Sequence, residues 1–409
     1  MSRLTSYVKP PRLRPGAVAP HQYRLFGNKV LITDEHGRWA FMSKPEYARL
    51  LAGLKTSDPL WPTLQPLGFV AGAYDFDAAA RRQFERSLLS WKGPASHVLL
   101  VDGMSLETAR RVVYFVFRCP GPQLTLEFVC EDAGAVWPVL WFLVQYARRR
   151  GEWARRPVFL IARAKTMTPD QADFLRSHAV TRCVTLELAG APDMKTAPPF
   201  KAQRARALLL KTACAPRAWA QWFETWGFES VKLLPPSLDT SATVPFLDFY
   251  GEWLAWLVEN GEQANVRDEW STTMLAGRSW ALPGMDILEQ LAYDANGKIF
   301  TSEAAAGSAG LCLGEAGELR YQDIAKRGAT AAVIAAAHAD NQPQCAQCAY
   351  RPFCALPPSL NEKEQGTLWG QTPSSPACAI QMGILDRIFS RLDDEKWLLL
   401  LNKWHVDMA

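Results

Sequence analysis

Residues 97–130 read HVLLVDGMSLETARRVVYFVFRCPGPQLTLEFVC, and the class of fold can be argued from this segment. Residues 97–101 form an apolar run with the length of a buried strand, and residues 124–130 form a second such run. Between them, residues 105–117 carry apolar side chains at helical spacing. A strand, a helix and another strand in this order predict two parallel strands joined by a helical crossover.

The same alternation of strand and helix continues to about residue 290. It predicts an α/β fold built on a parallel sheet, as a complete or partial TIM-type βα barrel, and the pattern leaves open whether the barrel closes. The further predicted strands cover residues 158–162, 182–188 and 228–234, and the further predicted helices cover residues 135–149, 168–177, 200–210, 218–226 and 246–259.

Changes in composition divide the remainder of the chain. Four prolines before residue 21 predict a flexible arm. Short strands and a helix that Ser43 can cap, with Glu46 at the capping-box position, predict a small α+β unit that follows the arm. The predicted domains are an arm at 1–20, a small N-terminal domain at 21–75, the barrel at 90–290, a Cys-rich domain at 291–395 and a tail at 396–409.

Composition favours a protein of the cytoplasm. The formal net charge of +4 is too small to indicate nucleic acid or membrane as a partner. Residues 1–20 lack an apolar stretch, and no window of about 18 apolar residues predicts a membrane span. Nine cysteines in a large chain without secretory features favour a reducing compartment. A run of five arginines between residues 148 and 156 is interpreted as a solvated helix end.

Four cysteines near the end of the chain have the spacing of metal ligands. Cys345, Cys348, Cys354 and Cys378 form C-x2-C-x5-C-x23-C, in which thiolates close in sequence can surround one metal. The alternative is four free or disulfide-bonded cysteines in a loop. Zinc and an iron–sulfur cluster both accept four thiolates, so the spacing leaves the metal open. We expect Cys119, Cys183 and Cys214 to be small packing residues. Cys312 is also interpreted as a packed residue, although it could approach the metal loop.

Charged residues at the predicted strand ends are the candidates for catalysis. Barrel active sites gather at the carboxyl ends of the strands. The residues there are Glu127, Glu131, Asp132, Glu187 and Lys232. They form no recognisable nucleophile–base pair or metal triad, and Glu131 with Asp132 can equally be a pair that favours a helix N-terminus. The catalytic residues therefore stay unknown at this level.

The ordered motifs resemble the radical SAM enzymes with a C-terminal SPASM domain, and are most similar to the His-Xaa-Ser system maturases, which modify ribosomally made peptides. The matching segments are residues 104–110 (MSLETAR), 126–128, 227–231 (GFESV), 246–250 and 294–300 (DANGKIF), followed by the four cysteines. The resemblance implies that residues 291–395 are a SPASM-like domain. It also implies that Cys345, Cys348, Cys354 and Cys378 hold one auxiliary [4Fe-4S] cluster, with zinc as the alternative.

The chain departs from that family where S-adenosylmethionine (AdoMet) would bind. The family carries C-x3-C-x2-C after the first barrel strand, whereas here residues 100–104 read LVDGM. A Gly-Gly-Glu-Pro segment of the family corresponds to residues 130–133, CEDA, where side chains with a Cβ obstruct the ligand. Pro358 occupies the position of an inner-cluster cysteine. We therefore expect one cluster and no AdoMet site.

These features predict a catalytically degenerate member of the family, which is not an active radical SAM enzyme by itself. It would act as the substrate-binding or partner subunit of an active maturase, in a heterodimer that modifies a precursor peptide. Residues 20–75 resemble a small winged-helix peptide-recognition domain, which adds a peptide strand to a sheet edge, and the alternative is a simple cap on the barrel. Two other functions stay open: an enzyme of a different reaction type on the same barrel, or a zinc-stapled scaffold.

Overall fold

The computed structural model describes residues 18–78, 80–81, 93–94, 96–210, 214–236, 240–275, 290–324, 326–337, 341–354 and 356–406. The chain divides into two compact units. The first contains residues 1–87 together with 343–354, and the second contains residues 88–342 together with 355–409. Most of the predicted arm, residues 1–17, lies outside the described residues.

The first unit is built on a three-stranded antiparallel sheet in the order β1-β2-β3. Its elements are β1 (Gln22–Phe26), β2 (Lys29–Thr33), β3 (Trp39–Ser43), α1 (Lys44–Ala52), α2 (Trp61–Leu64), α14 (Pro343–Ala346) and η5 (Arg351–Phe353). Apolar side chains of β2, β3 and the helices form one core, which includes Val30, Ile32, Met42, Leu50 and Phe69. The predicted helix start is confirmed, because Ser43 and Glu46 form a capping box.

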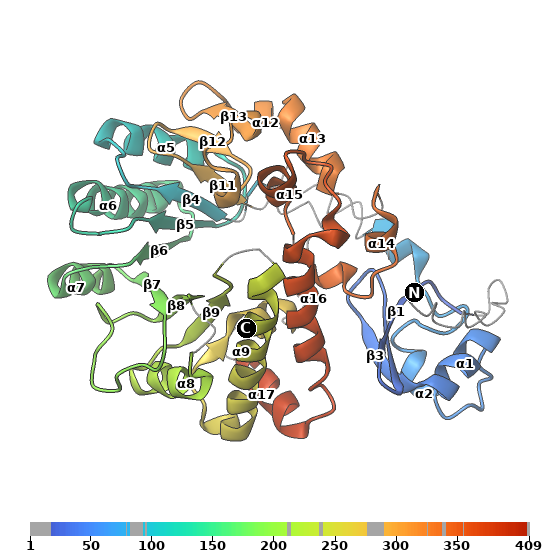
Figure 1. Ribbon diagram of the computed structural model, residues 1–409. Coiled ribbons are helices and arrows are strands. Elements are labelled where there is room, and N and C mark those ends of the chain that lie inside the picture. Colours follow the sequence, from blue (N-terminus) through green and yellow to red (C-terminus); the bar gives the residue numbers. More distant parts are fainter. Residues whose placement is uncertain are drawn as a thin grey trace. The chain divides into compact units, whose positions relative to one another are not determined.

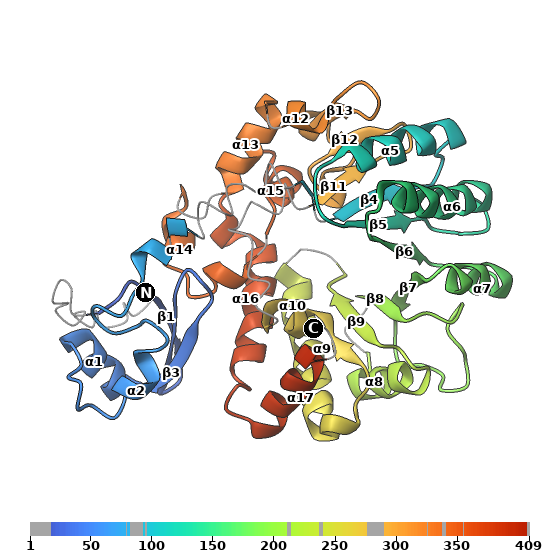
Figure 2. The ribbon, with the colours of Figure 1, turned by 180° about the vertical axis from the view of Figure 1, so that it is seen from behind.

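The second unit contains a ten-stranded sheet in the order β10-β9-β8-β7-β6-β5-β4-β11-β12-β13. Neighbours from β10 to β11 run parallel, and β12 and β13 continue the sheet antiparallel (Figures 1 and 2). The pairings of the described strands form an open series, without a link between β10 and β13. The strands are β4 (Ser96–Leu100), β5 (Leu124–Val129), β6 (Val158–Ala164), β7 (Val180–Leu188), β8 (Arg204–Leu209), β9 (Ser230–Leu234), β10 (Arg267–Asp268), β11 (Gln290–Tyr293), β12 (Lys298–Phe300) and β13 (Cys312–Glu315).

Helices cover the outer side of strands β4 to β9, as Figure 1 shows. These are α5 (Leu106–Arg118), α6 (Trp137–Ala154), α7 (Pro169–Ser177) and α8 (Pro216–Thr225). Ser105 caps α5 and a Thr168–Gln171 capping box starts α7. Both helices therefore begin within one residue of the predicted ranges 105–117 and 168–177. The α/β prediction is therefore confirmed for the mostly parallel sheet and its crossover helices.

The remaining elements of the second unit follow β9. They are α9 (Thr240–Asn260), η1 (Gly261–Gln263), α10 (Glu269–Leu275), η2 (Glu303–Ala305), η3 (Ala309–Leu311), α12 (Tyr321–Ile324), α13 (Gly328–Ala337), α15 (Pro358–Gln365), η6 (Thr372–Ser374), α16 (Pro376–Phe389) and α17 (Glu395–Val406). Side chains of η2, η3 and α13 form a core with Val98 of β4 and Ala292 of β11. Elements after residue 300 thus pack on the inner face of the sheet. Asn296 and Gly297 lie in the turn between β11 and β12, and Gly297 has φ +86°.

The prediction of a helix at residues 200–210 is wrong. Residues 204–209 form β8, which pairs with β7 and β9. Ala205, Ala207 and Leu209 are buried, and Arg204 and Arg206 alternate with them on the other face. This period of two places the apolar side chains under the helices and the arginines inside the curve of the sheet.

Residues 395–406 form α17, which the sequence analysis had not separated from the predicted tail. Trp397 and Trp404 of α17 are fully buried and lie 5.6 Å apart between ring centroids, so the helix is part of the packed core. In the described part of the chain, no helix combines the length and apolar character needed to cross a bilayer.

Candidate functional site

The connection between β4 and α5 is short and closed by its own hydrogen bonds. It spans residues 101–105. The Val101 amide donates to the Val129 carbonyl over 2.8 Å, and the Met104 amide donates to the Val101 carbonyl over 2.9 Å. The Asp102 carboxylate accepts from the Glu131 amide at 3.1 Å. This segment is a tight turn without a cysteine, tied to the end of β5.

Residues 130–134, which follow β5, are also held by hydrogen bonds within the protein. The Cys130 amide donates to the Arg163 carbonyl (3.0 Å), and the Lys165 amide donates back to the Glu131 carbonyl (2.9 Å). The Asp132 carboxylate accepts from the Gly134 amide and the Thr166 hydroxyl, both at 2.9 Å. These bonds continue the pairing of β5 with β6 past the strand ends. The backbone amides of Cys130, Glu131 and Ala133 are therefore already hydrogen-bonded within the protein.

Two of the sequence candidates form an exposed cluster at the strand ends. Lys165 Nζ lies 2.8 Å from Glu131 Oε2 and 3.6 Å from Glu187 Oε1. The hydrogen bond that Lys165 donates to the Glu131 carboxylate raises the pKa of Lys165. Asp132 does not join this group, because its carboxylate caps the following turn. Exposed ion pairs of this kind contribute little to stability.

A second charged cluster lies on the inner face of the sheet and includes Glu127. Arg163 joins two carboxylates: its Nε lies 2.7 Å from Glu127 Oε1, and its Nη2 lies 2.6 Å from Glu303 Oε2. Arg206 Nη2 lies 3.2 Å from the same Glu127 oxygen. Burial alone would raise the pKa of Glu127, but Arg206 and Arg163 outweigh it and hold that pKa below its usual value. We call Glu127, Arg163, Arg206 and Glu303 the inner ion cluster.

Lys232 lies beside the inner ion cluster on β9. Its ammonium group is 4.8 Å from the centroid of the Trp270 ring, a favourable cation–π distance. Burial, and then the charge of Arg206, lowers the pKa of Lys232. Across the described residues it makes no ion pair within 4.0 Å. The neighbouring Glu269 carboxylate accepts from the Ser230 hydroxyl at 3.0 Å.

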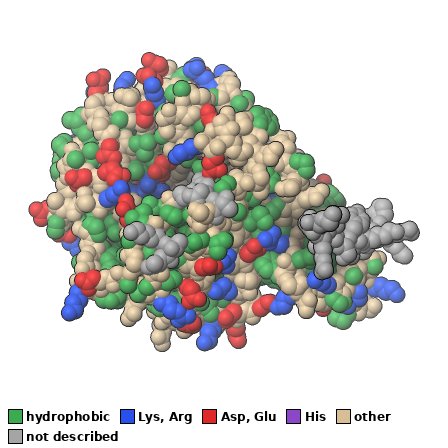
Figure 3. All heavy atoms as spheres, viewed as in Figure 1, with side chains coloured by type: hydrophobic (Ala, Val, Ile, Leu, Met, Phe, Trp, Pro, Cys, Tyr) green, Lys and Arg blue, Asp and Glu red, His purple; other side chains and the backbone are tan. Residues whose placement is uncertain are grey.

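The structure therefore separates the five sequence candidates into three places. Glu127 and Lys232 lie on the inner face of the sheet. Glu131 and Glu187 both form ion pairs with Lys165. Asp132 belongs to neither group. Figure 3 shows Lys, Arg, Asp and Glu side chains gathered around a hollow on this side of the molecule. Such groups can bind polar or charged parts of a ligand by hydrogen bonds, since partly buried charges interact more strongly than exposed ones.

Sequence reasoning missed three members of the inner ion cluster. Arg163 and Arg206 alternate with buried apolar residues on β6 and β8, which is the only local signal for them. Glu303 lies 140 residues after Arg163 in the sequence. No local pattern in the sequence indicates that long-range contact.

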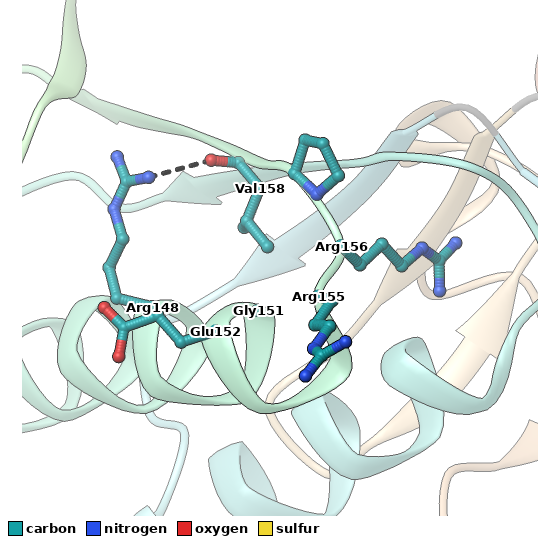
Figure 4. Close-up of a pocket in the computed structure, with 7 residues that line it drawn as sticks. Arg148, Gly151, Glu152, Arg155, Arg156 and Val158 are labelled. Atoms are coloured by element: carbon teal, nitrogen blue, oxygen red, sulfur yellow. Dashed lines mark hydrogen bonds between the residues drawn. The ribbon is translucent and has the colours of Figure 1, made fainter.

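Three arginines of the run, Arg148, Arg155 and Arg156, line a pocket of about 340 Å³ at the start of β6 (Figure 4). Arg148 donates to the carbonyls of Val158, His178 and Ala179, each at 2.9 Å. Arg156 donates to the Cys119 carbonyl at 2.8 Å. The interpretation of the run as a solvated helix end is therefore wrong for these two arginines. Their guanidinium groups bind backbone carbonyls at the ends of neighbouring elements, which gives this pocket a structural role.

Three of the four predicted metal ligands lie in the first unit. Successive turns connect them, because the Cys348 amide donates to the Cys345 carbonyl (3.2 Å) and the Cys354 amide donates to the Arg351 carbonyl (3.4 Å). Burial and the neighbouring Cys348 raise the pKa of Cys345, as expected when two thiols lie near each other.

Cys378 lies in the second unit, in the first turn of α16, where its amide donates to the Ser375 hydroxyl at 3.1 Å. Within the described ranges, no three His, Cys, Asp or Glu side chains come together in an arrangement that could hold a metal ion. The four-cysteine site therefore stays a prediction. Cys119, Cys130 and Cys183 are buried, and burial raises the pKa of each thiol to about 12. This fits the packing role expected for Cys119 and Cys183, whereas Cys214 is only partly buried.

Comparisons with known proteins identify the fold. No family model and no curated protein matches the sequence. The structure of native anSMEcpe with bound AdoMet matches with a TM-score of 0.58 and 10% sequence identity, over 77% of this chain and 100% of that chain. Native anSMEcpe with bound AdoMet and Cp18Cys peptide matches with a TM-score of 0.57 and 10% identity, over 76% of this chain and 99% of that chain.

A third structure, Streptococcus suis SuiB bound to precursor peptide SuiA, has a TM-score of 0.48 and 10% identity, over 86% of this chain and 97% of that chain. A TM-score below 0.5 is too low to support a conclusion about a shared fold. At 10% identity the anSMEcpe matches show a shared fold alone. The described α/β architecture, with its large and mostly parallel sheet, is consistent with a radical SAM-like fold.

Proposed function

We propose that this chain is a degenerate radical SAM/SPASM-like protein, which binds a ribosomally made peptide as the partner or substrate-binding subunit of an active maturase. One observation carries the proposal. The sheet has the fold of an AdoMet-bound structure, but the connection after β4 is a five-residue turn, residues 101–105, without cysteine. These five residues supply no thiolate ligands for the cluster that would cleave AdoMet.

The segment after β5 supports the same conclusion. Residues 130–133 use their backbone groups for pairing with residues 163–166. Glu131 places an acidic side chain where the resembling family has a glycine. Two independent changes therefore affect the region in which the family binds its cofactor.

Peptide binding is supported by two features of the described residues. The inner face of the sheet carries Arg206 and Lys232, which can interact with backbone carbonyls or carboxylates of a peptide. In the first unit, β3 pairs with β2 on one side, and no described strand pairs with its other edge. A free strand edge can accept an extended peptide. A fold like this one also holds a peptide in anSMEcpe with Cp18Cys.

Cys345, Cys348, Cys354 and Cys378 would hold one [4Fe-4S] cluster in this account. Such a cluster supplies either a structural crosslink or a site for one-electron transfer. The cysteines themselves order the loop that contains them, because metal–thiolate bonds stabilise segments that bury little apolar surface. Iron and sulfide analysis of anaerobically purified protein should give about four irons per chain. A colourless protein with one zinc would instead support the zinc-stapled scaffold.

The partner role can be tested by reconstitution with the precursor peptide and an intact radical SAM maturase encoded beside this chain. We expect the maturase alone to modify the peptide slowly and the mixture to modify it faster, as followed by mass spectrometry. The matched control is this chain with Lys232→Met and Arg206→Met, which should still fold but bind peptide less tightly. Equal modification with and without the wild-type chain would refute the partner role.

A second candidate is an enzyme of a different reaction type, and Lys232 is the observation that favours it. A lysine with a lowered pKa next to a buried carboxylate can serve in acid–base catalysis. Single-turnover assays would separate the two functions. If Lys232→Met abolishes product formation by this chain alone while peptide affinity is unchanged, the enzyme is favoured over the binding subunit.

A further inference from the structure

Arg206 and Lys232 lie side by side on the inner face of the sheet. They are register partners in the parallel pairing of β8 with β9, so their side chains point to the same face. The Arg206 side chain is 28% exposed, which means that solvent reaches this part of the face. Burial and then the charge of Arg206 lower the pKa of Lys232, as expected for two neighbouring cations.

The inner ion cluster balances its own charges, and Lys232 adds one more. The cluster contains two carboxylates and two guanidinium groups, which pair with one another. No carboxylate of the described residues forms an ion pair with Lys232, although Glu269, Glu127 and Glu303 act on it from a distance. This part of the sheet therefore holds a cation whose charge no contacting carboxylate neutralises.

Both cations also keep hydrogen-bond donors for another group. Within the described ranges, Arg206 donates to Glu127 through Nη2, whereas its Nη1 lies 3.6 Å from Glu303, beyond hydrogen-bond length. The ammonium of Lys232 has three N–H donors and lies 4.8 Å from the centroid of the Trp270 ring. The indole N–H of that ring donates to a backbone carbonyl of β9 at 2.8 Å, which fixes the ring beside the ammonium.

The charge and the surroundings of these donors favour a carboxylate as the ligand. One unneutralised ammonium matches one negative charge, whereas a phosphate dianion would be repelled by the carboxylates of the inner ion cluster. Leu208 and Leu234 are the next register pair on the same face, and both are half-buried. With Trp270 they provide apolar surface beside the cations. The site therefore fits an organic acid better than an inorganic anion.

We infer that Arg206 and Lys232 bind a carboxylate of the peptide, so that this chain selects peptides with an acidic side chain or a free C-terminus. The inference rests on the proposed function as a peptide-binding subunit and adds the chemical class of the peptide. A carboxylate has two acceptor oxygens, which suit one guanidinium and one ammonium group. Its charge-assisted hydrogen bonds are stronger than those of the matching amide, which gives the selection.

Three synthetic pentapeptides of the sequence Ala-Leu-Xaa-Leu-Ala test the inference. The first has Glu as Xaa and both ends blocked, the second has Gln and both ends blocked, and the third has Gln and a free C-terminal carboxylate. Dissociation constants for the full wild-type chain are measured by isothermal titration calorimetry. We expect at least one carboxylate peptide to bind about tenfold more tightly than the blocked Gln peptide. The tighter one identifies the source of the carboxylate.

Equal affinity for all three peptides would overturn the inference, and so would the absence of binding at millimolar concentration. This comparison is made on the wild type, so it does not depend on the folding of any variant.

Lys232→Met assigns the preference to this site, because it removes the ammonium and keeps an unbranched side chain. We expect the variant to lose the preference of about tenfold while it binds the blocked Gln peptide like the wild type. Lys232→Arg keeps the charge and should retain the preference. Lys298→Met is the matched control, since Lys298 is an exposed lysine on β12 of the same sheet. An undiminished preference in Lys232→Met would contradict the inference.

Failure of this inference and failure of the proposed function give different results. Equal binding of the three peptides leaves the partner role intact, because other contacts can hold the precursor peptide. Equal modification of the precursor with and without this chain refutes the partner role. It leaves the carboxylate preference unchanged, because that preference is measured on this chain alone.

Discussion

Arg163 lies between the carboxylates of Glu127 and Glu303, and its side chain is 9% exposed. Removal of one partner from a buried ion pair leaves an uncompensated charge, which typically costs about 3–5 kcal/mol. We expect Arg163→Met to lower the free energy of unfolding by about this amount, as measured by urea denaturation. Arg217→Met is the control, because Arg217 pairs with Glu259 on the surface and should unfold like the wild type. Wild-type stability of Arg163→Met would contradict the described geometry.

Asp268 provides a pH-dependent test at the same scale. Burial raises its pKa to about 6, although its carboxylate accepts from the Tyr250 hydroxyl and from Ser271. The folded state therefore keeps a proton that the unfolded state loses near its usual pKa of 3.8. The stability contributed by this proton is present below pH 3.8 and is lost as the pH rises through 6.

We expect wild-type stability to fall relative to Asp268→Asn as the pH rises from about 4 to about 6. Urea midpoints measured at several pH values check this. A constant difference between the two proteins across that range would show that Asp268 titrates normally.

Residue-level prediction from sequence succeeded only in part. Glu127 and Lys232 were candidates because they lie on predicted strands, and both face the inner side of the sheet. Arg206 was missed because its segment was predicted to be a helix. Glu303 was missed because its partner, Arg163, is 140 residues away. Contacts between distant segments leave no local pattern.

At the scale of elements, α7 offers a clear test of a helix start that the sequence predicts. Thr168 and Gln171 form a capping box that satisfies free amides of the first turn. We expect Thr168→Ala to reduce stability by about 1 kcal/mol, as measured by urea unfolding of the full chain. Ser177→Ala, at the other end of α7, should change stability far less. Equal losses from both substitutions would argue against the cap.

The alternating strands and helices were predictable because their periods differ, and α5 and α7 also begin at capping residues. Residues 200–210 were the exception. Alanines and leucines in RARALLL have high helix propensity, and only pairing with β7 and β9 selects the strand. Tertiary pairing therefore overrode local preference at β8.

At the scale of the whole molecule, the sequence predicted the mostly parallel sheet but not the assignment of residues 343–354 to the first unit. The bond between Thr33 and Ala349 spans 316 positions. Four cysteines at metal-ligand spacing indicate a shared metal, but they do not indicate which surface their loop covers.

The central claim is that this chain keeps the fold of an AdoMet-bound protein without the means to cleave that cofactor. The most direct measurement is an anaerobic assay with dithionite and AdoMet, in which 5′-deoxyadenosine is quantified by chromatography and an active radical SAM enzyme serves as the positive control. The account predicts no 5′-deoxyadenosine above the level of a protein-free sample. Catalytic formation of 5′-deoxyadenosine by the native protein would contradict it. The control is heat-denatured protein with Cys345 and Cys348 intact, which should then have lost this activity.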